Sequence, residues 1–215
     1  MVDIINAMFE LILIIGGILL SVTIHEAVHA FTSHWLGDDT AFRLGRLTLN
    51  PLAHIDPFST ILLPLLLVSF GLPPFAAAKP VPFNPSRVRG GEYGAALVGV
   101  SGPLSNLIIA VLVGVWGRFV IGFDGSVIAD VMSLIVQINI ALFVFNMIPW
   151  PPLDGSRLLY AFAPDGLRRV MAQIESFGLL GIGLFMFTIF PLLSGTFVRA
   201  VQVLFELITG VKLVF

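Results

Sequence analysis

The stretch LILIIGGILLSVTIHEAVHAF, residues 11–31, places ionisable side chains inside a strongly apolar segment. The fifteen residues before Glu26 carry no formal charge, and Glu26 itself follows His25 and precedes His29 in a helical register. An ionisable residue at the centre of a membrane helix costs roughly 2.5 to 3.5 kcal/mol. Three such residues within five positions therefore need a partner that compensates for their burial.

The composition of the chain indicates an integral membrane protein. Of the 215 residues, 57% are hydrophobic and 11% are charged, and the mean hydropathy is +1.01, whereas a soluble domain has about 25% charged residues. The net charge of −2 and the lack of a basic block give no reason to expect a nucleic-acid partner. Because the chain has no cysteine, a metal ion would have to be bound by His, Asp or Glu.

The apolar segments predict an all-α polytopic membrane protein, since a spanning helix needs about 20 apolar residues. We expect about five transmembrane helices, at residues 9–36, 93–118, 128–149, 176–196 and 197–215. The first segment lacks a basic n-region and is too long for a signal peptide, so we expect a retained span. No polar segment is long enough for a soluble domain. We therefore expect one membrane-embedded domain over 1–215, with a core at 9–165 and C-terminal helices at 176–215.

Residues 57–75, PFSTILLPLLLVSFGLPPF, are apolar but interrupted. Their uninterrupted apolar core is only about ten residues long and contains Pro64, which favours a re-entrant or interfacial hairpin over a full span. The turn-rich segments on either side, 36–57 and 76–91, predict short extended strands at the membrane interface.

The distribution of basic residues orients the chain, because short cytoplasmic loops carry an excess of Arg and Lys. If 57–75 enters and returns, the connections 37–57, 71–92 and 150–175 share one side of the membrane. Those connections hold Arg43, Arg46, Lys79, Arg87, Arg89, Arg157, Arg168 and Arg169, against Arg118 and Arg199 on the other side. If 57–75 spans, the same residues divide almost evenly. We therefore expect the hairpin, with these connections cytoplasmic and the N-terminus outside.

His25, Glu26 and His29 form an H-E-x-x-H pattern. On a helix, positions i and i+4 lie one above the other, so both imidazoles can reach one metal ion, while Glu26 lies about 100° round the helix and can contact a water at the site. Zinc then needs a further protein ligand and an open position. The alternative is that the two histidines are neutral packing residues and Glu26 is protonated, which does not explain their spacing.

The third ligand is expected to be acidic and to lie near the same membrane depth. In FNMIPWPPLDGSRLL, residues 145–159, three prolines forbid regular helix, and irregular backbone at this depth is tolerated only inside protein or against a water-filled cavity. Asp154 follows these prolines, and Gly155 allows close approach of the backbone. Asp154 could instead cap the helix that follows it. His54 and Asp56 are the competing candidates for the third ligand.

The pairing of HEAVHA with NMIPWPPLDG resembles the site-2 protease family of intramembrane zinc metalloproteases, and most closely its compact bacterial-type members without regulatory domains. The resemblance runs from about residue 10 to 170 and includes LNPLAHIDP, AKPVPFNP and GVSGPLSN. It implies one Zn²⁺ bound by His25, His29 and Asp154. It also implies that Glu26 is the general base and that Asn146 polarises the scissile carbonyl or holds the substrate strand.

The family resemblance implies hydrolysis of peptide bonds in or near transmembrane segments of membrane proteins. The expected location is the cell (inner or cytoplasmic) membrane, with the active site toward the cytoplasmic side and the lipid bilayer as surroundings. Residues 57–75 and the strand-like 76–84 are candidates for gating and for pairing with an unwound substrate. Two further features add detail. Trp150-Pro151 departs from the residues usual in the family. In SGPLSN, Gly102 permits close helix packing and Asn106 is an interhelical donor, with a position of Asn106 near the site as the alternative.

Two other classes of protein remain open from the residues alone. An intramembrane metal-ion transporter would place polar residues along a continuous path on several helices and would show inverted repeats. The chain instead concentrates its ionisable residues at one depth and shows no repeat. A catalytically inactive membrane scaffold could keep the metal site or only its fold.

Overall fold

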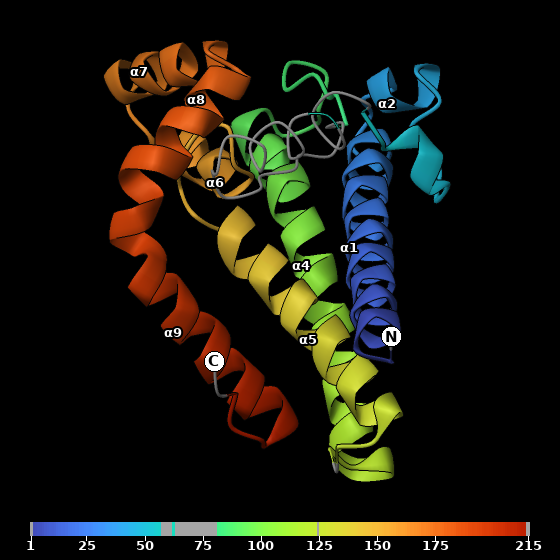
Figure 1. The fold of residues 1–215 in the computed structure, drawn as a ribbon. Helices are drawn as coiled ribbons and strands as arrows, with labels where there is room; N and C mark the ends of the chain where they lie inside the picture. Colours follow the sequence, from blue (N-terminus) through green and yellow to red (C-terminus); the bar gives the residue numbers. More distant parts are fainter. Residues whose placement is uncertain (1, 57–61, 63–80, 124, 214–215) are drawn as a thin grey trace.

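A computed structural model describes residues 2–56, 62, 81–123 and 125–213 and consists of long helices with short ones at one end (Figure 1). The long helices are α1 (Val2–Trp35), α4 (Glu92–Trp116), α5 (Val127–Asn146) and α9 (Phe190–Thr209). The shorter elements are α2 (Thr40–Arg43), the 3₁₀ turn η1 (Pro51–Ala53), α6 (Gly155–Phe162), α7 (Asp165–Ser176), α8 (Leu179–Leu184), and the π-helical turns η3 (Gly117–Ile121) and η4 (Phe185–Ile189).

Helix α4 lies at the centre of the bundle, where it contacts α1, α5, α6 and α9. The largest apolar cluster joins α4, α5 and α9 and consists of Ala110, Val136, Ile140, Val201, Phe205 and Ile208. The outer faces of the helices are apolar as well, as Ile12 and Leu20 on α1 illustrate with exposed fractions of 64% and 62%. A helix that is apolar all round and still exposed is typical of a membrane-spanning segment.

Four helical segments among the described residues are long and apolar enough to cross a bilayer: Leu11–Trp35, Glu92–Ile121, Val127–Asn146 and Leu180–Thr209. The chain is therefore an all-helical, multi-pass membrane protein, as predicted. The predicted number of about five spans is wrong for the described residues, because 176–196 and 197–215 are not separate helices. Instead α8, η4 and α9 follow one another without a break. Pro191 causes no interruption, because it lies in the first turn of α9, where a missing N–H is tolerated.

The prediction of short strands is also wrong for the described part of 36–57 and for 81–91, where no strand forms. These segments are tied together by side-chain contacts instead of a sheet. The Asp38 carboxylate accepts hydrogen bonds from the backbone N–H of Thr40 at 3.1 Å and of Asn84 at 2.6 Å. The residues of the predicted hairpin, 57–75, lie outside the described residues except for Leu62, as do residues 76–80 of the strand-like 76–84.

The described parts of the three connections that carry most of the basic residues lie at the same end of the bundle (Figure 1). Helix α2, the segment 81–91, and helices α6 and α7 all gather there, whereas the turn between η3 and α5 lies at the opposite end. Most of the basic residues therefore lie at one end of the bundle.

Candidate metal centre

His25 and His29 lie on the face of α1 that packs against α4, and both are buried, with exposed fractions of 5% and 8%. The two helices approach closely because α4 presents Gly102 at this point. A Cβ atom at Gly102 would lie 2.3 Å from Nε2 of His29 and 2.8 Å from Nε2 of His25. The predicted role of Gly102 in close helix packing therefore includes making room for both imidazoles.

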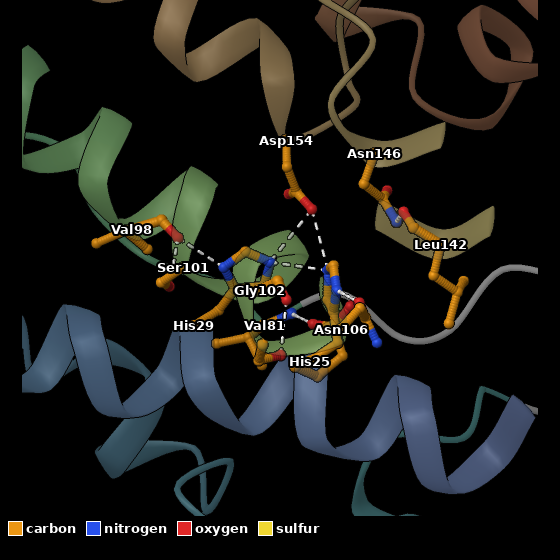
Figure 2. Close-up of polar contacts among 12 residues, drawn as sticks. His25, His29, Val81, Val98, Ser101, Gly102, Asn106, Leu142, Asn146 and Asp154 are labelled. Atoms are coloured by element: carbon orange, nitrogen blue, oxygen red, sulfur yellow. Dashed lines mark hydrogen bonds and ion pairs between the residues drawn. The ribbon is translucent and has the colours of Figure 1, made fainter. Parts of the chain in front are cut away.

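Asp154 completes a cluster with the two histidines (Figure 2). Its Oδ2 atom lies 3.0 Å from Nε2 of His25 and 3.3 Å from Nε2 of His29, and the two Nε2 atoms are 3.0 Å apart. Among the described residues, these three form the group whose ligand atoms all lie within 4.8 Å of one another. The H-E-x-x-H pattern and the proline-bounded aspartate, far apart in the sequence, thus meet in space.

The chain reaches this position by folding back after α5. The Pro151–Pro152 peptide bond is cis, and Gly155 lies so close to the end of α5 that a Cβ atom there would be 2.4 Å from the carbonyl oxygen of Met147. Asp154 immediately precedes α6, but its carboxylate makes no capping hydrogen bond. The carboxylate points to the histidines instead, so the alternative role of Asp154 as a helix cap is not the one that its side chain adopts.

The hydrogen bond at Nδ1 of each imidazole determines whether Nε2, the nitrogen that faces Asp154, carries a proton. Nδ1 of His29 lies 2.7 Å from the carbonyl oxygen of Val98, which can only accept, so Nδ1 carries the proton. Nδ1 of His25 lies 2.5 Å from Oδ1 of Asn106. A neutral imidazole protonated at Nδ1 has a bare Nε2, so two ring nitrogens and a carboxylate oxygen converge as acceptors.

Three converging acceptors repel one another unless a cation lies among them. Two imidazole nitrogens, one carboxylate oxygen and an open position make up a donor set that suits Zn²⁺. The residues present therefore fit a zinc ion.

Glu26 faces a cavity of about 270 Å³ that also reaches His29 and Asp154. The cavity is lined in addition by Val81, Pro82, Phe83, Gly99, Pro152, Arg157 and Glu175. The Glu26 carboxylate accepts a hydrogen bond from the backbone N–H of Val81 at 2.9 Å. The expected base thus lies beside the metal-ligating group and in contact with the open space.

The cavity wall contains an ion pair that was not predicted from the sequence, between Arg157 on α6 and Glu175 on α7. The Arg157 guanidinium lies over the ring of Phe83, 5.4 Å from its centroid. The Tyr160 hydroxyl donates to Glu175 at 3.1 Å, and burial together with the Glu175 charge raises the pKa of Tyr160 to about 12. The position of Arg157 could have been predicted from the sequence, because residues three apart share a helical face and Arg157 therefore lies on the same side as Asp154. Nothing local marks Glu175.

Asn146 and the competing ligands do not belong to the cluster. The Asn146 amide donates to the carbonyl oxygen of Leu142 at 3.0 Å, within its own helix, and Asn146 is not among the residues that line the cavity (Figure 2). The His54 ring donates from Nε2 to the carbonyl oxygen of Thr48 at 2.9 Å. Neither His54 nor Asp56 belongs to the metal-ligating group found among the described residues.

This chain is similar to several bacterial proteins that are named as zinc metalloproteases. It is 39% identical over 170 residues to "Putative zinc metalloprotease YwhC" of Bacillus subtilis, which covers 76% of this chain and 74% of the relative. It is 29% identical over 198 residues to "Putative zinc metalloprotease Rip2" of Mycolicibacterium smegmatis, covering 91% of this chain and 73% of that protein. The Mycobacterium tuberculosis protein of the same name is 29% identical over 201 residues. No family model and no solved structure matches the chain.

The membrane-spanning helices and the group of two histidines and one aspartate identify the chain as an intramembrane metalloprotein. The chain belongs to the site-2 protease family of intramembrane zinc metalloproteases. Its cofactor is Zn²⁺.

Proposed function

We propose that this protein hydrolyses peptide bonds in or near the transmembrane segments of membrane proteins, with one Zn²⁺ held by His25, His29 and Asp154. The observation that carries this proposal is the convergence of two bare imidazole nitrogens and one carboxylate oxygen, all within 3.3 Å of one another. Their position beside a cavity, and not in a closed core, leaves the fourth position for water or substrate.

Zinc, when bound, polarises the scissile carbonyl and lowers the pKa of water toward neutrality. The remaining steps belong to side chains of this protein. Glu26 accepts a proton from the attacking water and delivers it to the leaving amide nitrogen, a role that contributes typically 10²- to 10⁴-fold in rate. The N–H of Val81 orients the Glu26 carboxylate before substrate arrives.

Asn146 is proposed to donate a hydrogen bond to the carbonyl oxygen as negative charge develops there. Its amide is bonded to the carbonyl oxygen of Leu142 at 3.0 Å. That bond uses one of the two N–H donors of the amide, so the second N–H can donate to the carbonyl oxygen of a substrate. Asn146 is the last residue of α5, the helix after which the chain folds back to Asp154, and this supports a position near the site.

The chemistry of a helical substrate supports cleavage of an unwound segment. The backbone carbonyl groups of a membrane helix are hydrogen-bonded within that helix. A substrate helix must therefore open locally before one of its carbonyl groups can be attacked. The gating role predicted for 57–75 and 76–84 concerns this step and remains a prediction.

We infer that the site opens toward the cytoplasmic side of the cell membrane, because the cavity lies at the end of the bundle that holds most basic residues. We also infer that residues 9–165 form the catalytic core of one membrane-embedded domain. The packing of α9 against α4 and α5 supports including the C-terminal segment 176–215 in that same domain.

The proposal is tested with purified protein, a transmembrane peptide and a zinc titration. Wild type should bind one zinc per chain and cut the peptide, whereas Glu26→Gln should bind zinc and cut at least about 10²-fold more slowly. Glu206→Gln is the matched control, because Glu206 is an exposed acid on α9 away from the site. Zinc binding with ion flux across proteoliposomes and no cleavage would identify a transporter, and zinc binding with neither would identify an inactive scaffold.

A further inference from the structure

Three buried polar side chains from three different helices lie directly behind His25. Asn106 on α4 and Asn139 on α5 have exposed fractions of 0%, and Ser21 on α1 has 4%. Burying an amide without hydrogen-bond partners costs several kcal/mol, and polar residues inside a membrane bundle are therefore found paired across helices. These three form a continuous chain of hydrogen bonds that ends at the His25 ring.

The direction of every bond in this chain is fixed by backbone carbonyl oxygens, which can only accept. Asn106 donates from Nδ2 to the carbonyl oxygen of Ser21 at 3.4 Å and to Oδ1 of Asn139 at 2.9 Å. Asn139 donates from Nδ2 to the carbonyl oxygen of Ile135 at 2.9 Å and to the Ser21 hydroxyl at 2.9 Å. Neither amide can be turned over without placing an oxygen against a carbonyl oxygen.

This fixed direction leaves Oδ1 of Asn106 facing Nδ1 of His25 at 2.5 Å. Because Oδ1 is an acceptor, Nδ1 must carry the ring proton, and Nε2 must be bare on the side of His29 and Asp154. The backbone carbonyl oxygen of Val98 fixes the same tautomer at His29, because it accepts a hydrogen bond from Nδ1. The tautomer of His29 is thus set by the main chain, whereas that of His25 depends on one side chain.

We propose that Asn106 is a positioning residue of the zinc site: it holds His25 in the Nδ1–H tautomer, and Asn139 and Ser21 hold Asn106 in the orientation that does so. The proposal rests on the proposed function, in which Nε2 of His25 binds zinc. Partners that donate to or accept from the outer nitrogen of a metal-binding histidine commonly change metal affinity by about 10- to 100-fold.

The test is Asn106→Leu, which keeps a similar volume and removes the acceptor. In zinc-free protein, ¹⁵N NMR of the histidine ring nitrogens should report loss of the Nδ1–H preference at His25. In a competition with a chromophoric chelator, zinc affinity should fall by about 10- to 100-fold.

Ser105→Ala is the matched control, because the Ser105 hydroxyl is buried on the same helix and donates only to the carbonyl oxygen of Gly102, at 2.6 Å. It should leave both measurements unchanged. If Asn106→Leu fails to fold, Asn139→Leu takes its place. Asn139 does not touch His25, and its loss should shift the His25 tautomer in the same direction by a smaller amount.

The outcome that overturns the proposal is an Asn106→Leu protein, or failing that an Asn139→Leu protein, with the wild-type tautomer at His25 and wild-type zinc affinity. Failure of the proposed function would look different. In that case wild type itself would bind no zinc, or His25→Ala would bind zinc as tightly as wild type.

Discussion

Replacing Gly102 with alanine tests the proposed zinc site through its shape alone, because the change adds one methyl group and no charge. The new Cβ atom would lie 2.3 Å from Nε2 of His29 and 2.8 Å from Nε2 of His25, whereas ordinary contact begins at 3.4 Å. One ring nitrogen must therefore move by about 1.1 Å and the other by about 0.6 Å, or α4 must move away from α1.

Neither ring can move freely, because each is bonded behind, His29 to Val98 and His25 to Asn106. Zinc ligand distances hold to within about 0.2 Å, so the required displacements are several times that tolerance. A misplacement of about 1 Å at a catalytic site can cost about 10²-fold in rate. We expect Gly102→Ala to lose at least about 100-fold in zinc affinity and in cleavage rate.

The assay is chelator competition for zinc, together with cleavage of a transmembrane peptide at saturating zinc. Gly16→Ala on α1 is the matched control, because a Cβ atom there would meet nothing within 4 Å. It should bind zinc and cleave as wild type does. Equal zinc affinity and cleavage in the two alanine variants would refute the reasoning, because the histidines would then tolerate a side chain at Gly102.

Asp154→Ala should abolish zinc binding in metal analysis, because one of three ligands is lost; retained zinc would point to another third ligand. Asn146→Ala should bind zinc normally but cleave about 10²- to 10³-fold more slowly, and an unchanged rate would mean that its amide does not contact the scissile carbonyl. For Asp38, burial raises the pKa, but hydrogen bonds from Thr40 and Asn84 lower it below the ordinary 3.8. A lowered pKa gives stability that is present above that value and lost as pH falls. The unfolding temperature of wild type should therefore drop below about pH 3.8 more steeply than that of Asp38→Asn, and equal slopes would exclude this contribution.

Much of the metal-ligating group could be predicted from the sequence, because it depends on helical periodicity and on local chain breaks. Four residues of separation bring His25 and His29 to one face of α1, and the prolines before Asp154 end α5 near the same depth. Such signals need no knowledge of tertiary packing. The direct contact between Asp154 and both histidines follows from these two local facts and from the close approach at Gly102.

The parts that could not be predicted depend on which distant segments meet. Glu175 reaches Arg157 only because α7 folds back over α6, and Val81 reaches Glu26 from another connection altogether. In the sequence Asn139 is an isolated polar residue in an apolar span. Its partner Asn106 comes from α4, and the contact depends on how α4 packs against α5. The predicted division into two C-terminal spans, 176–196 and 197–215, was wrong for a different reason, because α9 runs from Phe190 to Thr209 across the expected boundary.

The hydrogen-bonded chain of Ser21, Asn106 and Asn139 also fixes how far α1, α4 and α5 can slide past one another. A shift of one helical turn moves each side chain by 5.4 Å, which would separate every donor from its acceptor in this chain. Apolar surfaces in lipid offer little resistance to such slippage, so a few polar pairs can specify the register. A bundle assembled out of register would also separate His25 from Asp154 and would lack the site. Zinc binding would then report correct assembly of the helices, and only a correctly assembled protein could bind zinc and cleave a substrate.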